Sequence, residues 1–118
     1  MSNTPDIFIE GIDVVIKRDL DKHKSLLERA KLSLISFREG VSHEVHRKNH
    51  YIGLINEGKY NETAMRSSIG DININIRHLS DKSKLAKEEI EHHALIVDTL
   101  TQQLADYNES ALRHASRA

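Results

Sequence analysis

Histidine is the residue type with the clearest capacity for chemistry in this sequence, at eight of 118 residues. His43, His46 and His50 are spaced i, i+3 and i+7, which places all three near one face of a helix. His46 and His50 stand four residues apart, the spacing at which two imidazoles on a helix can share a metal ion. The pattern fits either a solvated polar face or a metal site.

A second set of metal-binding candidates consists of His23, His93 and Glu89. Both histidines fall on the apolar seam described below, and Glu89 precedes His93 by one helical turn. Inward histidines and a carboxylate can bind a divalent metal in a helical bundle. The same histidines also fit a hydrogen-bonded pair that fixes helix register, or a pair that loosens the bundle when protonated. A divalent metal is the one cofactor that these patterns suggest.

The segment Arg47, Lys48 and His50 could bind a small anionic ligand, such as a nucleotide, between protomers of an oligomer. Lys48 also follows Glu44 by four residues, in the order that favours an ion pair on a helix. The sequence therefore predicts a Glu44–Lys48 pair close to this candidate ligand site.

Composition and motifs argue against several other functions. The absence of cysteine excludes thiol catalysis, and neither a nucleophile elbow nor a glycine-rich phosphate loop is present, so a non-enzymatic protein is expected. A net charge of −1 with 30% charged residues makes nucleic-acid binding unfavourable. The sequence shows no signal peptide and no apolar run of membrane-spanning length, which favours the cytoplasm and no membrane partner.

The residues that position these groups form two long heptad patterns. The first pattern consists of Leu20, Leu27, Leu34, Val41, Lys48 and Ile55, alternating with His23, Ala30, Phe37, Glu44 and Tyr51. The second consists of Ile69, Ile76, Ser83, Ile90, Val97, Leu104 and Ala111, alternating with Ile72, Leu79, Ala86, His93, Leu100, Tyr107 and His114.

The two patterns predict an all-α fold, a long antiparallel helical hairpin that resembles a coiled coil. We expect a single domain over 1–118, with a helix over about 12–55, a turn at 56–61 and a helix over about 63–115. A register in which facing residue numbers sum to 120 pairs Val41 with Leu79 and Phe37 with Ser83, and it alternates large and small side chains across the seam. The alternative is an α+β fold with short strands at 7–16 and 71–77, where β-branched residues or period-two alternation occur.

Apolar residues outside the seam predict self-association. Leu32 and Ile35 on the first helix, and Leu95 on the second, have no seam position to fill, and Ile74 and Leu85 share this property. A homodimeric four-helix bundle would cover such residues. The alternative is that they are scattered exposed leucines and isoleucines on a monomer, which are normal on protein surfaces.

The expected function is therefore that of a helical interaction or assembly protein that acts as a homo-oligomer. Adaptors, chaperone-like proteins and small inhibitors, including phage-encoded ones, act by binding with this architecture, although architecture alone does not determine function. A histidine-based metal-binding bundle and an oligomeric binder of a small anion are the two alternatives.

Overall fold

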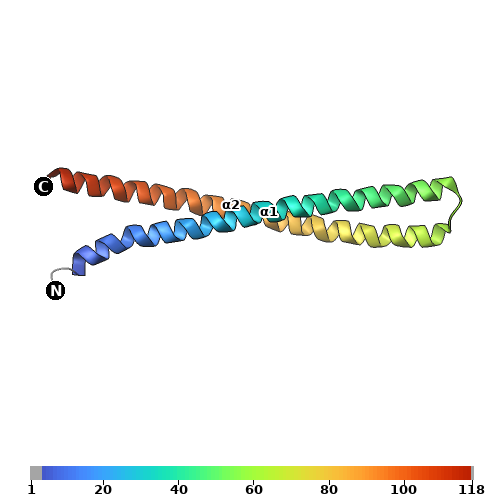
Figure 1. Ribbon diagram of the computed structural model, residues 1–118, viewed down its shortest axis with the longest axis horizontal. Helices are drawn as coiled ribbons and strands as arrows, with labels where there is room; N and C mark the ends of the chain where they lie inside the picture. Colours follow the sequence, from blue (N-terminus) through green and yellow to red (C-terminus); the bar gives the residue numbers. More distant parts are fainter. Residues whose placement is uncertain (1–3, 118) are drawn as a thin grey trace. The chain divides into compact units, whose positions relative to one another are not determined.

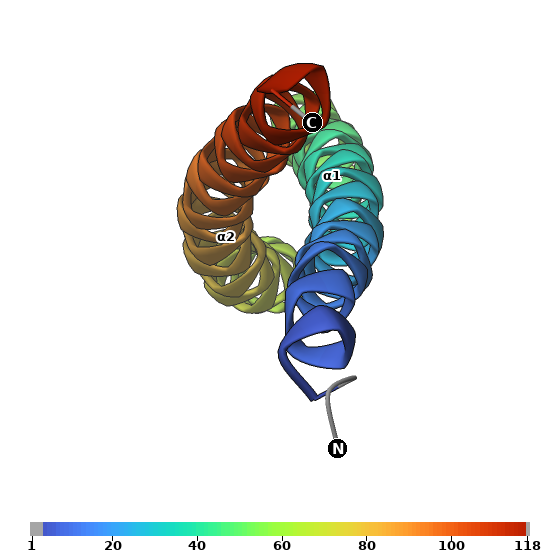
Figure 2. The ribbon, with the colours of Figure 1, turned by 90° about the vertical axis from the view of Figure 1, so that its left-hand side faces the viewer.

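The chain folds into two long helices joined by a tight turn, in a computed structural model that describes residues 4–117 and the side-chain environments of 11–115. Helix α1 spans Thr4–Glu57 and helix α2 spans Glu62–Arg117. Both views show the two helices without interruption (Figure 1, Figure 2). The prediction of an all-α helical hairpin is thus confirmed.

The alternative with strands at 7–16 and 71–77 is wrong, because both segments lie inside helices and no strand occurs within residues 4–117. The physical reason is clearest in the second segment. Ile69, Ile72 and Ile76 keep the three- and four-residue spacing that one helix face can bury, and Ile72 is only 1% exposed. A strand there would need a neighbouring strand to bond its backbone.

The contacts within the chain group into two compact units. Unit 1 combines Met1–Arg29 with Glu89–Ala118, and unit 2 comprises Ala30–Glu88. Unit 2 therefore contains the turn together with the adjoining parts of both helices, while unit 1 contains the remaining part of each helix.

The turn in unit 2 is shorter than the predicted segment 56–61, because each helix extends further than expected. Gly58 adopts a φ of +70°, and its N–H donates a hydrogen bond to the Ile55 carbonyl at 3.0 Å, which ends α1. At the start of α2, the Asn61 side-chain oxygen accepts a hydrogen bond from the Ala64 N–H at 3.2 Å. Asn61 is thus the N-cap of α2.

Two glycines near the turn predict stability changes of opposite sign. Gly58→Ala places a Cβ on a left-handed residue and should destabilise the fold by about 1–2 kcal/mol. Gly53→Ala should stabilise it by about 1 kcal/mol, since Gly53 lies inside α1 and an added Cβ meets no atom within 4 Å. Urea unfolding of both variants checks this; a loss of stability in Gly53→Ala would contradict the helical environment assigned to that residue.

The predicted seam forms the core of both units. All of its residues from Leu20 to Ile55 and from Ile69 to Tyr107 are buried or half-buried, while Ala111 and His114 are exposed. In unit 2 the Leu79 side chain covers Gly40, where an added Cβ would lie 3.1 Å from Leu79 Cδ1. This contact lies one residue from the predicted pairing of Val41 with Leu79, so the register is correct to within a residue at this point.

Candidate functional site

The two seam histidines of unit 1 form a direct pair. His23 Nδ1 and His93 Nδ1 lie 3.0 Å apart, and the ring centroids are 5.2 Å apart. The ring of His92 contacts His93 edge-on, with centroids also 5.2 Å apart. At this distance the two nitrogens form a hydrogen bond in which one Nδ1–H donates and the other Nδ1 accepts. Which ring donates depends on the tautomer of each histidine.

The predicted third ligand of this set, Glu89, is an exposed residue of α2. Across residues 11–115, no three histidine, aspartate or glutamate side chains converge on a point where they could hold a metal ion. Of this candidate set, only His23 and His93 lie in contact. This geometry matches the expectation that a hydrogen-bonded polar pair sits on the seam.

Unit 2 contains a buried carboxylate on its seam, Glu44, at 9% exposure. Arg47 Nη1 donates to both of its carboxylate oxygens at 3.0 and 3.2 Å, and Asn75 Nδ2 donates from α2 at 3.5 Å. Hydrogen bonding to Glu44, and then its negative charge, raise the pKa of Arg47 above its ordinary value. The burial of Glu44 is thus compensated by partners on both helices.

The predicted pairing of Glu44 with Lys48 is wrong, because Arg47 takes that place. Arg47 and Lys48 both lie within reach of Glu44 along the helix. The planar guanidinium of Arg47 donates to both carboxylate oxygens, whereas the ammonium of Lys48 is a compact point charge. Asn75 was outside the predicted set of partners, since only the packing of α2 against α1 within unit 2 places it near Glu44.

The histidines at 43, 46 and 50 of α1 do share one face. His43, His46 and His50 line a shallow hollow of about 370 Å³ together with Arg47 and Tyr51. The His50 and Tyr51 rings meet at an angle of 60°, with centroids 5.9 Å apart. All three histidines are exposed, so the face is a solvated polar surface with an aromatic edge.

The candidate anion-binding residues Arg47, Lys48 and His50 are only partly united. Arg47 and His50 line the hollow, whereas Lys48 is half-buried on the seam and does not line it. The Arg47 guanidinium is already bonded to Glu44, which neutralises much of the positive charge that an anion would need.

The predicted interaction residues are exposed. Leu32 is 65% exposed and Ile35 is 52% exposed in unit 2, and Leu95 is 67% exposed in unit 1. In unit 2, Ile74 and Leu85 of α2 are also exposed, and they lie eleven residues apart, about three helical turns, on one face. The hairpin therefore leaves apolar side chains outside its seam on both helices.

The exposed apolar side chains of unit 2 project away from the seam on both helices. Ile35 stands one turn before Arg38, which lines the groove between the helices beside Lys87. Leu85 stands one turn after Lys82, whose Nζ lies 6.0 Å from the centre of the Phe37 ring. Lys82 and Lys87 are five residues apart on α2 and project to opposite sides of that helix.

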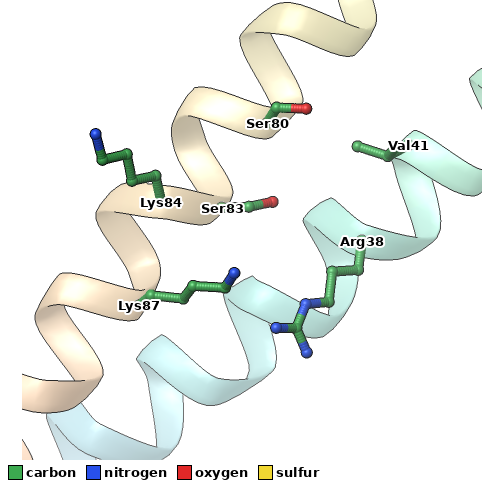
Figure 3. A pocket seen from close by; sticks show the side chains of 6 residues that line it. All are labelled: Arg38, Val41, Ser80, Ser83, Lys84 and Lys87. Atoms are coloured by element: carbon green, nitrogen blue, oxygen red, sulfur yellow. The ribbon is translucent and has the colours of Figure 1, made fainter.

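The groove between α1 and α2 in unit 2 holds a cluster that the sequence patterns do not single out. A hollow of about 300 Å³ is lined by Arg38, Val41, Ser80, Ser83, Lys84 and Lys87. Figure 3 shows both serine side chains projecting towards α1 and the Lys87 side chain extending towards Arg38, while the Lys84 ammonium turns away. The signal that could reveal this cluster is the position of Arg38, Ser80 and Lys87, each directly beside a seam residue.

Within the part of the chain that the structure describes, no helix has an apolar stretch long enough to cross a membrane. Comparison of the chain with protein-family models, with curated proteins and with solved structures finds no match.

Proposed function

We propose that this chain is a non-enzymatic helical interaction protein that works as a homo-oligomer. The observation that carries the proposal is the exposure of four large apolar side chains in unit 2, Leu32, Ile35, Ile74 and Leu85, each more than half exposed. Apolar surface of this kind is stabilised when another helix covers it, because burial removes it from water.

The balance between buried and exposed apolar residues supports this proposal. Among the described residues, the buried leucines and isoleucines are Leu20, Leu34 and Ile72, whereas twelve large hydrophobic residues are exposed. Two packed helices can bury only one face each, so the remaining apolar positions need a partner.

The solvent-accessible surface area also supports self-association. The 13.5 kDa chain exposes 9024 Å², whereas a compact monomer of that mass exposes roughly 6,500 Å². The difference is roughly 2,500 Å² for one chain, and large obligate interfaces bury up to about that area on each partner. A second copy of the chain is the simplest partner that could cover it.

The positions of the apolar faces suggest how copies would meet. Since both helices of unit 2 carry exposed apolar side chains, one copy can pair α1 with α1 of another copy about a twofold axis. It can also pair α1 with α2 of another copy, a head-to-tail contact that continues unless the ring closes. Both arrangements bury Leu32 and Ile35.

Light scattering after size exclusion tests the proposal. The expected mass is at least twice 13.5 kDa, and Leu32→Glu/Ile35→Glu should reduce it to that of the monomer. Gln103→Glu/Asn108→Glu is the control, because it adds the same charge at exposed positions of α2 in unit 1 and removes no apolar surface. Ile74→Glu/Leu85→Glu separates the two arrangements, since only the head-to-tail contact needs the α2 face. A monomeric wild-type chain would overturn the proposal.

A further inference from the structure

We propose that the groove of unit 2 binds the phosphate group of a small phosphorylated ligand, through Arg38, Ser80 and Lys87. These residues line one hollow between α1 and α2 (Figure 3). The site lies within a single chain and does not depend on self-association.

The cationic side chains at this hollow have no carboxylate partner within ion-pair distance among the described residues. Within the described residues, Arg38, Lys84 and Lys87 form no ion pair, although Glu88 follows Lys84 at the spacing of a helical ion pair. Arg38 and Lys87 approach each other from different helices, and no acidic side chain lines the hollow between them. A bound anion would supply the charged partner that these cations lack.

One of the two hydroxyl groups at the hollow is free to donate a hydrogen bond to a ligand. Ser83 donates its hydroxyl proton to the Leu79 carbonyl at 2.9 Å, so this proton is already used. Ser80 forms no side-chain hydrogen bond within the described residues and projects towards α1, so its hydroxyl is free to donate (Figure 3). A guanidinium, an ammonium and a hydroxyl together supply donors for several oxygens of one phosphate group, and the planar guanidinium suits two of them.

The size of the hollow favours a ligand larger than a bare phosphate ion. Its volume of about 300 Å³ lies at the lower end for small-molecule pockets and equals about ten times the ~30 Å³ share of one water molecule. Val41 adds an apolar surface at the seam side. A phosphate group could therefore be held by the cations while part of the attached molecule contacts the seam.

The groove suits an anion better than the histidine-lined face of α1. There, the Arg47 guanidinium is occupied by Glu44, at 3.0 Å. In the groove, Arg38 has no such partner, and two helices rather than one supply the donors. We therefore place the anion-binding site in the groove rather than at Arg47, Lys48 and His50.

Amide chemical shifts of the full ¹⁵N-labelled chain test the site, with sodium phosphate, adenosine monophosphate and sodium acetate as probes at constant ionic strength. We expect saturable shifts at Arg38, Ser80 and Ser83 with a dissociation constant of about 1 mM or tighter for at least one phosphate-bearing probe. Equal affinity for both phosphate probes would show that the group alone is recognised, and tighter binding of the nucleotide would show that the attached part contributes.

Two charge-matched variants make the test decisive. Arg38→Gln/Lys87→Gln should weaken binding by about tenfold or more, because each lost donor is a charged one. Lys59→Gln/Lys82→Gln, which removes the same charge from unit 2 outside the hollow, should bind as the wild type does. Equal weakening in both variants, acetate binding as tight as phosphate, or no saturation up to about 10 mM of either phosphate probe would overturn the proposal.

Discussion

Ile72→Ala is expected to lower the free energy of unfolding by about 2–5 kcal/mol, the largest stability change predicted for this chain. Ile72 is 1% exposed and is the most deeply buried large side chain among the described residues. Removing three carbons there takes away buried apolar surface and leaves a cavity between two helices that cannot fully close it. Urea unfolding of the full chain measures the effect.

The matched control is Ile74→Ala, two residues further along α2. Ile74 is 56% exposed, so the same loss of atoms should change the stability of the monomer by about 0.5 kcal/mol or less. At higher protein concentration the two variants should differ in a second way. The loss in Ile72→Ala should not depend on concentration, whereas an effect of Ile74→Ala should grow if the α2 face is covered by another copy. If Ile72→Ala and Ile74→Ala lowered the stability of the dilute monomer equally, the assignment of Ile72 to the buried seam would be contradicted.

The His23–His93 pair predicts a loss of stability when one partner is removed. One Nδ1 donates to the other across 3.0 Å. His23→Ala should lower the free energy of unfolding by about 1–3 kcal/mol, since it leaves the half-buried His93 without its partner. Urea unfolding measures the effect.

Two further variants separate the hydrogen bond from the loss of a side chain. His23→Leu/His93→Leu should be closer to the wild type in stability than His23→Ala, because two apolar residues replace the polar pair. His43→Gln/His46→Gln, which replaces two exposed histidines, should change the free energy of unfolding by about 0.5 kcal/mol or less. A leucine variant as unstable as His23→Ala would contradict the prediction.

The histidine pair also bears on the metal-binding alternative. Two imidazole nitrogens 3.0 Å apart can act as two ligands, yet no third histidine or carboxylate converges with them within residues 11–115. Structural zinc sites use four ligands. A two-ligand pair therefore fits a hydrogen bond on the seam better than a structural metal centre.

The helical hairpin and its seam are determined by the sequence alone. Residues such as Leu20, Leu34 and Ile72 recur at heptad spacing, and this local period decides both the helical state and the buried face. The same pattern overrides the strand-like alternation at 71–77, because the apolar residues there keep the helical spacing as well. The face shared by His43, His46 and His50 also follows from their spacing along one helix.

Only the tertiary structure decides which side chains pair and which remain free. Lys48 and Arg47 both stand within one turn of Glu44, and helical spacing cannot choose between them. In the folded chain the Arg47 guanidinium pairs with the buried carboxylate, which Asn75 of α2 also contacts. Likewise, Arg38 and Lys87 lie far apart in the sequence, and no local pattern joins them. The packing of α2 against α1 within unit 2 places them at one groove, because contacts between distant segments depend on register and rotamer as well as on residue type.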